Sequence, residues 1–262
     1  MTGRKLKLGM ALSGGGARGI AHIGVLQALR EAGIVPEVLS GTSAGAIVGA
    51  LHASGHTPED MLEFVKDTSI WRIFTVNLPY DGLTKLTYLK KRLTECIAED
   101  SFEALNHPLY ITVSNLNSGS LRTISRGPLF DAVVASSSIP LVFKPVELDG
   151  ELYVDGGLLD NLPAEPILPE SEIVVGVNVM PTLPVKSKSI QTVFGIATRC
   201  FEMSIYANSR NNLENCDVVI TPTKLQQYNI FQFNKYQSIY EIGYEAGVEA
   251  VPRLTNLLAE YA

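Results

Sequence analysis

Three groups of small and polar residues in this chain have types and spacings that could do chemistry. The first is residues 41–45, Gly-Thr-Ser-Ala-Gly, which places Ser43 between two glycines. Apolar runs stand on both sides, so we expect a strand, a tight turn with Ser43 at its apex, and a helix. A Cβ atom at Gly41 or Gly45 would collide with neighbouring backbone in such a turn. Ser43 is therefore a candidate nucleophile at a helix N-terminus, and an ordinary glycine-rich turn is the alternative.

The second group is a glycine-rich loop at residues 13–19, which follows one apolar run and precedes a helical pattern. Gly14, Gly16 and Gly19 have the G-x-G-x-x-G spacing of dinucleotide-binding folds. Those folds also need an acidic residue at the end of the second strand, to bind a ribose. This chain has the Ser43 turn at that place, so the pattern argues against a dinucleotide site.

The same loop offers its backbone N–H groups to an anion. Consecutive amides at Gly14, Gly15 and Gly16, near a helix N-terminus, favour such binding. If the first two strands are neighbours, their carboxyl ends meet and the loop lies beside Ser43, where a tetrahedral oxyanion needs donors. Arg18 could donate to that oxyanion or hold the loop in shape, and the sequence leaves both roles open.

Ser43 needs a proton acceptor within hydrogen-bond reach to act as a nucleophile. Hydrolase triads on α/β folds place their histidine late in the chain, but no histidine follows His107 here. His22 falls within a helical pattern, where we expect a packed side chain. His52 and His56 come after the helix that follows Ser43, so we expect them at its far end. His107 stands at a strand entrance.

The third group supplies a better candidate base, Asp155. This residue ends an expected strand and precedes Gly156 and Gly157, which permit close approach of other groups. A simple Asp-Gly turn is the alternative for such a motif in isolation. A carboxylate is a good base near neutral pH only when burial or a like charge raises its pKa. We therefore expect Asp155 to be buried.

The elements that must position these groups follow from hydrophobic periodicity and turn residues. Strands are expected near residues 7–12, 35–40, 109–114, 121–124, 146–148, 151–154, 173–179 and 218–220. Helices are expected near residues 20–29, 46–51, 84–97, 128–135, 190–208 and 238–261, and another begins after a Thr57 cap. Aromatic and lysine residues gather in residues 71–99, where we expect a lid-like insertion, with a solvated surface helix as the alternative.

The composition narrows the class of protein. The chain has 262 residues with 46% hydrophobic content, which suits one α/β domain over residues 1–262. Its net charge of −6 argues against nucleic acid as a partner. The three cysteines have no metal-like spacing and suit a reducing compartment. No apolar run is long enough for a signal peptide or a membrane span, so we expect a cytoplasmic protein.

Together the three groups resemble the signature blocks of the patatin-like phospholipase family, in the family's order. The blocks are residues 14–19, 41–45 and 155–157, a fourth is similar at residues 135–140 with 143–145, and residues 160–163 are similar to its continuation. The resemblance covers about residues 7–180 and is greatest to compact bacterial members. One departure is Ser13, where many members carry an aspartate.

The resemblance implies a three-layer α/β/α sandwich with a mostly parallel central sheet. It implies that Ser43 is the nucleophile, that Asp155 activates it in a Ser-Asp dyad, and that the loop from Gly14 to Arg18 supplies the oxyanion hole. The implied reaction is the hydrolysis of phospholipid or other lipid acyl esters through an acyl-enzyme, with no cofactor and no metal.

Two other functions stay open on the same residues. One is a short-chain esterase or thioesterase, and the other is a regulatory scaffold that no longer catalyses. A lipid ester is the expected partner, and the sequence is compatible with peripheral contact at the inner face of the membrane. Homo-oligomerisation is also compatible with the sequence.

Overall fold

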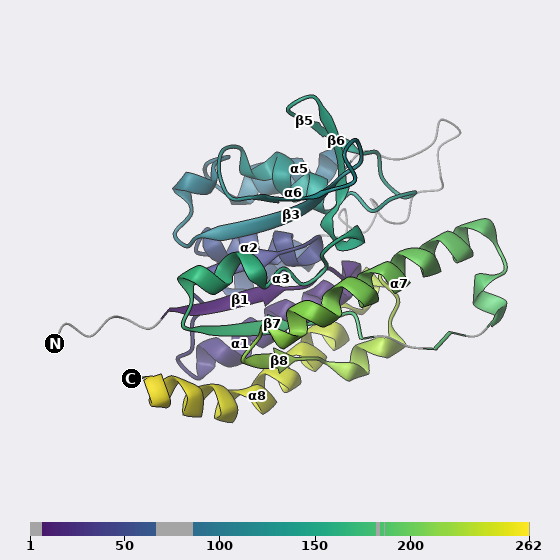
Figure 1. The fold of residues 1–262 in the computed structure, drawn as a ribbon. Helices are drawn as coiled ribbons and strands as arrows, with labels where there is room; N and C mark the ends of the chain where they lie inside the picture. The colour runs from purple at the N-terminus through teal and green to yellow at the C-terminus, as the bar shows by residue number, and fades with distance from the viewer. Residues whose placement is uncertain (1–6, 67–85, 182–183, 186, 262) are drawn as a thin grey trace.

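The computed structural model describes residues 7–66, 86–181, 184–185 and 187–261. One eight-stranded sheet forms its centre, in the order β5-β6-β3-β2-β1-β7-β8, with β4 paired to β3 beside this path (Figure 1). The strands are β1 (Leu8–Leu12), β2 (Val38–Gly41), β3 (Leu109–Asn115), β4 (Leu121–Ile124), β5 (Val146–Leu148), β6 (Glu151–Asp155), β7 (Ile173–Val177) and β8 (Val218–Ile220). Five neighbouring strands run parallel to one another: β3, β2, β1, β7 and β8. Strands β4 and β6 run antiparallel to β3, and β5 runs antiparallel to β6.

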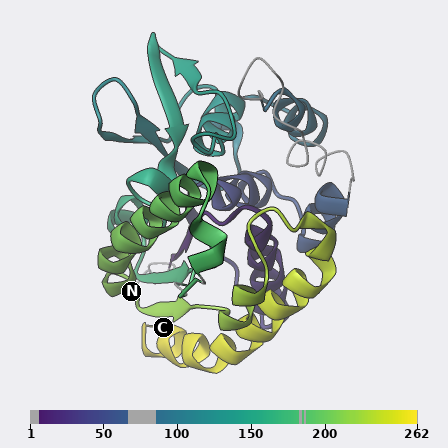
Figure 2. The same ribbon diagram turned by 90° about the vertical axis from the view of Figure 1, so that its right-hand side faces the viewer.

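Helices cover both faces of this sheet. They are α1 (Ile20–Glu31), α2 (Ala44–Ala53), α3 (Pro58–Lys66), α5 (Thr87–Cys96), α6 (Leu129–Ser136), α7 (Val193–Glu214) and α8 (Tyr236–Tyr261). Helices α1, α2 and α6 lie on one face, and α8 packs along α1 beside β8 (Figure 2). The other face carries α7 and the short helix η4 (Glu165–Glu170). This arrangement confirms the expected α/β sandwich with a mostly parallel sheet.

The apolar residues of β1 build a core on both faces of the sheet. Met10 and Leu12 point into the larger core that α1 and α2 cover, and both are fully buried. Ala11, between them, packs on the opposite face against Val38 and Ile167. A continuous apolar strand is the pattern expected for a parallel strand that helices cover on both sides.

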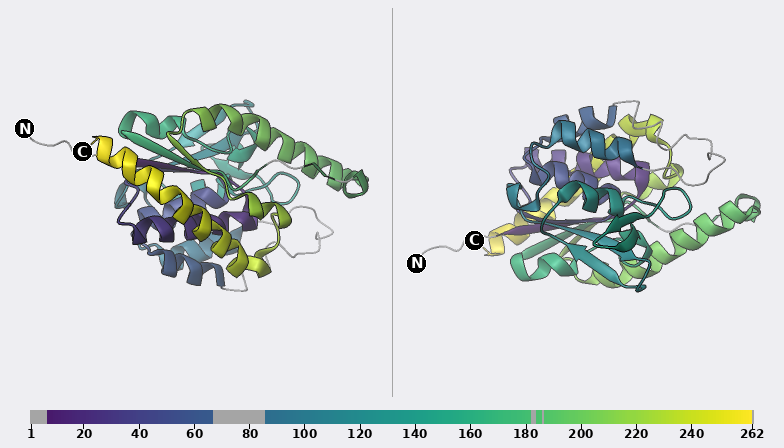
Figure 3. Two further views of the ribbon diagram at one scale, coloured as in Figure 1. Left: turned by 90° about the horizontal axis from the view of Figure 1, so that it is seen from below. Right: turned by 90° about the horizontal axis from the view of Figure 1, so that it is seen from above.

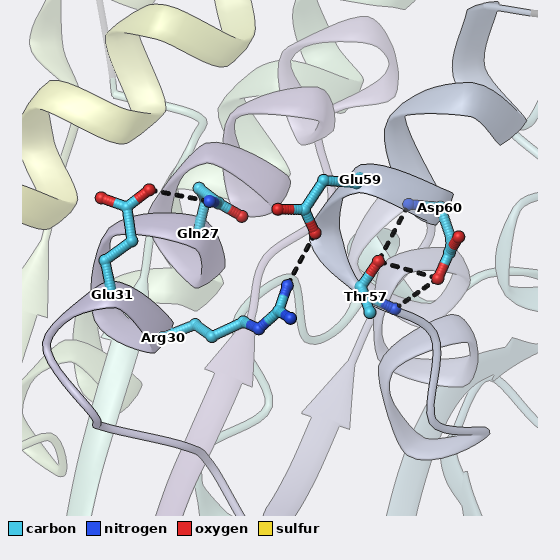
Figure 4. Close-up of polar contacts among 6 residues, drawn as sticks. All are labelled: Gln27, Arg30, Glu31, Thr57, Glu59 and Asp60. Carbon is cyan, nitrogen blue, oxygen red and sulfur yellow. Dashed lines mark hydrogen bonds and ion pairs between the residues drawn. The ribbon is translucent and has the colours of Figure 1, made fainter.

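A capping box begins α3, and an ion pair joins α3 to α1 (Figure 4). The Thr57 hydroxyl accepts from the backbone N–H of Asp60 at 3.2 Å, and the Asp60 carboxylate accepts from the Thr57 backbone N–H at 2.9 Å. This confirms Thr57 as the cap. Arg30 of α1 pairs with Glu59 of α3 at 2.6 Å. Both side chains are exposed, so the pair contributes little to stability.

Half of the expected insertion at residues 71–99 lies outside the described residues, and the predicted lid falls mainly on that part. The described half is α5, which confirms the expected amphipathic helix. Its residues Leu89 and Leu93 are buried. Lys90 pairs with Asp131 of α6 at 2.7 Å, which ties α5 to the body of the protein.

Candidate active site

Ser43 stands at the apex of a strained turn between β2 and α2. Its backbone has φ 54 and ψ −120, a conformation that costs free energy for a residue with a Cβ atom. The turn is crowded: a Cβ at Gly41 would lie 2.5 Å from the Gly45 carbonyl oxygen, and one at Gly45 would lie 2.1 Å from that of Leu12. Both flanking glycines are therefore sterically required, as the sequence predicts.

Ser136, from another helix, binds the backbone of the Ser43 turn. The backbone N–H of Ser43 donates to the Ser136 hydroxyl oxygen at 2.8 Å, and that hydroxyl donates to the Thr112 carbonyl at 2.8 Å. Ser136 ends α6 and Thr112 lies in β3. The strained backbone of Ser43 is thus fixed to the neighbouring strand of the sheet.

Asp155 is buried next to Ser43. The residue is only 2% exposed, which confirms the expected burial. Its carboxylate accepts a hydrogen bond from the Ser43 hydroxyl and another from the Gly157 backbone N–H, the latter at 2.8 Å. Burial raises the pKa of the Asp155 carboxyl to about 7, and these two hydrogen bonds limit the rise. A carboxyl with this pKa can accept a proton near neutral pH.

An antiparallel strand delivers Asp155 to the carboxyl edge of a parallel sheet. Asp155 is in register with Val113 of β3, two residues beyond Ile111, which pairs with Gly41 of β2. Strand β6 therefore begins beyond the carboxyl ends of the parallel strands, runs towards them, and ends at Asp155. No Cβ would fit at Gly156, because it would lie 2.3 Å from the Thr112 carbonyl oxygen.

The glycine loop lies beside Ser43, although its amides are not equivalent. A Cβ at Gly14 would lie 3.2 Å from the Ser43 Cβ, which places the loop next to the nucleophile. However, the Gly14 backbone N–H donates to the Asn161 carbonyl at 3.0 Å. The prediction that Gly14 offers its amide to an oxyanion is therefore wrong, because this donor already has a partner inside the protein.

Three other backbone amides near Ser43 have no hydrogen-bond acceptor among the described residues. Within the described part of the chain, the backbone N–H groups of Gly15, Gly16 and Ala44 donate to no other residue. Gly16 and Ala44 line the same cavity as Ser43. The amide of Ala44 was not among the sequence candidates, although the residue after the nucleophile is a regular donor in such turns.

Arg18 has partners away from the nucleophile. Its Nε donates to the Tyr228 carbonyl at 2.7 Å, its Nη1 lies 3.3 Å from the Met180 sulfur, and burial lowers the pKa of the guanidinium. Arg18 lines a different, polar cavity, not the one that contains Ser43. Of the two roles that the sequence leaves open, this placement favours holding the loop in shape.

The four histidines lie apart from the Ser43 cavity. His22 is fully buried in α1, where its Nε2 lies 2.8 Å from the Ser13 carbonyl and burial lowers its pKa to about 4. His52 stacks on His107 with ring centres 5.7 Å apart, and both line a cavity with His56 at the far end of α2. These positions confirm the expected packing of His22 and the distant location of the others.

Ser43 opens onto a narrow apolar cavity with a free volume of about 70 Å³. Apolar side chains from four helices line it: Ile20, Ile23, Ile47, Val48, Leu51, Phe64 and Leu89. It follows α2 from Ala44 to Leu51, a distance of about 10 Å at the helical rise. Among the described residues, no group of three or more His, Cys, Asp or Glu side chains is placed to hold a metal ion.

The sequence matches the model of the patatin-like phospholipase family over residues 10–168, which is more than half of the chain. The chain belongs to this family. No described helix of this patatin-like chain combines the length and the apolar character needed to cross a membrane.

Relatives of this patatin-like chain are longer proteins. An uncharacterized NTE family protein of Mycobacterium bovis is 37% identical over 163 residues, which are 62% of this chain and 45% of the relative. Lysophospholipase nte1 of Aspergillus fumigatus is 27% identical over 282 residues, 95% of this chain and 18% of the fungal protein. The chain thus spans less than half the length of either relative.

A solved structure shares the fold. Human GIVD cytosolic phospholipase A2, in complex with methyl gamma-linolenyl fluorophosphonate, superposes with a TM-score of 0.52 at 12% identity. The superposition covers 98% of this chain and 59% of the human one.

Proposed function

We propose that this patatin-like chain is a serine hydrolase that cleaves acyl esters of lipids. The observation that carries the proposal is the buried Asp155 carboxyl hydrogen-bonded to Ser43, at the mouth of an apolar cavity. The family and the name of the fungal relative, a lysophospholipase, support the lipid class of substrate. Single-domain organisation over residues 1–262 is part of the same proposal.

In the proposed acylation step, Asp155 accepts the proton of the Ser43 hydroxyl while the serine oxygen attacks the ester carbonyl carbon. The backbone N–H groups of Gly15, Gly16 and Ala44 donate to the resulting oxyanion. Asp155 then gives its proton to the leaving alcohol oxygen as the carbonyl–oxygen bond breaks, which leaves an acyl-enzyme on Ser43. Asp155 then deprotonates a water molecule, which attacks the acyl carbon. The bond between that carbon and the Ser43 oxygen breaks, Asp155 returns the proton to the Ser43 oxygen, and the fatty acid is released.

The electrostatics suit both directions of this proton transfer. A pKa of about 7 means that Asp155 is ionised in a large fraction of molecules near neutral pH, yet is a strong enough base to take a proton. No histidine is required as an intermediary. We propose that Arg18 acts on this chemistry only through the loop that it holds to Tyr228.

The apolar cavity is the proposed place for the acyl chain. Its described lining is hydrophobic apart from Ser43 and Ser137, so a buried hydrocarbon chain gains about 0.8 kcal/mol for each methylene group removed from water. A substrate of this kind resides in lipid assemblies. We therefore also propose that the protein is cytoplasmic and contacts the inner face of the membrane peripherally.

The test combines covalent labelling with turnover. Wild-type protein should react with a fluorescent fluorophosphonate and should hydrolyse p-nitrophenyl octanoate. Ser43→Ala should remove both reactions, and Ser54→Ala, at the other end of α2, should keep both. Labelling that persists in a folded Ser43→Ala variant, or a wild type that turns over no acyl ester, would contradict the proposal.

A further inference from the structure

A second apolar groove, with a volume of about 360 Å³, lies beside the proposed catalytic pair. The loop at residues 139–142 forms one wall and the N-terminal half of α7 forms the other, with Ala197 and Phe201 facing the groove. Leu158 and Ile230 complete its inner end. No charged side chain belongs to its described lining, in contrast to the neighbouring polar cavity around Arg18 and Glu202.

The inner end of the groove lies close to the proposed catalytic pair. Ile139 lines both the groove and the cavity that contains Ser43, so the two spaces lie on either side of this residue. The backbone N–H of Asp155 donates to the Ser138 carbonyl at 3.0 Å, which places Ile139 beside Asp155. On the opposite side, a Cβ at Gly16 would lie 2.4 Å from the Ile230 carbonyl oxygen. The inner end of the groove thus lies between the glycine loop and Asp155.

The direction of the reaction determines which part of a substrate occupies each space. If the acyl chain lies along α2, the alcohol portion must leave on the side of the group that protonates its oxygen. That group is Asp155, and the groove opens on the side of Asp155, past Ile139 and Leu158. The groove is therefore the space available to the alcohol portion.

We propose that this groove binds a hydrocarbon chain carried by the alcohol portion, so that preferred substrates have apolar chains on both sides of the scissile ester. This inference rests on the proposed function. A lysolipid, whose alcohol portion is a polar headgroup, would leave the groove empty. A diacyl glycerolipid would fill both spaces.

The rim of the groove provides an apolar entrance for such a chain. Leu141 and Leu116 line the groove and are 52% and 48% exposed. Leu141 also has a positive φ of 69, which is an unfavourable conformation for leucine. Such strained residues cluster at functional sites. The N-terminal end of α7 projects past the rest of the molecule beyond the same edge of the sheet (Figure 3). A lipid chain would cover this apolar surface.

The experiment compares two esters that share an acyl chain: dioctanoyl phosphatidylcholine and 1-octanoyl lysophosphatidylcholine, both as monomers. Wild type should favour the diacyl ester in kcat/KM by about tenfold or more, the value of roughly two buried methylene groups. Ala197→Trp fills the groove and should bring that ratio close to one. Ala207→Trp, the same change at an exposed position of α7 outside every cavity described above, should keep the wild-type ratio.

A second variant does not depend on a large side chain fitting near the core. Leu141→Asp places a charge on the exposed rim, and aspartate tolerates a positive φ better than leucine, so the fold should be retained. It should lower the diacyl preference as well. A wild type that cleaves the lysolipid as fast as the diacyl ester, or equal ratios for Ala197→Trp and Ala207→Trp, would overturn the groove assignment. Failure of wild type to hydrolyse p-nitrophenyl octanoate would instead overturn the proposed function.

Discussion

The backbone N–H of Gly14 donates to the carbonyl of Asn161, 147 residues further along the chain, at 3.0 Å. This bond joins the glycine loop to the segment that follows Asp155. Asn208 of α7 continues the connection, because its side chain accepts from the Asn161 backbone N–H at 3.0 Å and donates to the Gly157 carbonyl at 2.9 Å. The proposed oxyanion donors and the proposed base are therefore held as one unit.

The Asn161 side chain should be needed for catalysis without touching the substrate. It is 1% exposed, and its Oδ1 would lie 2.5 Å from a Cβ at Gly14 and 2.9 Å from one at Gly157. Asn161→Ala should loosen both segments and lower kcat about tenfold or more, with little change in KM, since misplaced donors lose transition-state stabilisation. Steady-state kinetics with p-nitrophenyl octanoate measure this. Asn215→Ala, at the C-terminal end of α7, is the control, and an unchanged kcat in Asn161→Ala would refute the role.

The pH dependence of kcat/KM should follow the ionisation of Asp155. Because the base must be ionised and its pKa is about 7, kcat/KM should rise with pH through a single inflection near that value. Asp155→Asn should lower kcat by about 10²- to 10⁴-fold, the usual contribution of a general base. His56→Gln should leave the profile unchanged, since His56 lies at the other end of α2. A profile that shifts with His56 and not with Asp155 would assign the base to the histidine.

Stability should also depend on Asp155. Its carboxyl titrates near 3.8 in the unfolded chain and near 7 in the folded protein, so between these values the folded state binds more protons. The free energy of unfolding therefore falls as pH rises from about 4 to about 7. Above pH 7, where the carboxyl is ionised in both states, Asp155 causes no further change. Asp155→Asn escapes the penalty, so its stability relative to wild type should increase from pH 5 to pH 8 by about 2.5 kcal/mol.

Urea unfolding of both proteins at the two pH values tests this. Asp160, whose pKa burial raises to about 6, is present in both proteins, so its contribution cancels in the comparison. The same stability difference at pH 5 and pH 8 would show that the carboxyl is not buried as described.

Phe64 should limit the length of the acyl chain. Phe64 is 5% exposed and lines the cavity, and with Leu51 and Ser54 it also lines a pocket at the end of α2 away from Ser43. Phe64→Ala extends the cavity, so the ratio of kcat/KM for p-nitrophenyl dodecanoate over butanoate should rise about tenfold, as for two more buried methylene groups. Phe102→Ala removes an equally buried ring outside the cavity and should leave the ratio unchanged. A ratio that changes equally in both variants would reflect general loosening of the core.

The sequence alone is enough to predict the turn at Ser43 and most of the elements. Gly41, Gly45 and the apolar runs around them are neighbours in the chain, and the geometry of a tight turn depends on such neighbours. The absence of histidines after His107 also directs attention to Asp155, and the need for a raised pKa predicts its burial. These inferences need only local conformation and the chemistry of single residues.

The tertiary structure decides which groups remain free to act. The amide of Gly14 is committed to Asn161, and the guanidinium of Arg18 to Tyr228, 210 residues away. No pattern near residue 14 or 18 contains this information, because a donor's partner depends on which distant segments fold against it. The same holds for β6, whose antiparallel direction still brings Asp155 to the carboxyl edge. Turn geometry is local, whereas hydrogen-bond satisfaction and desolvation are set by residues that meet only in the folded chain.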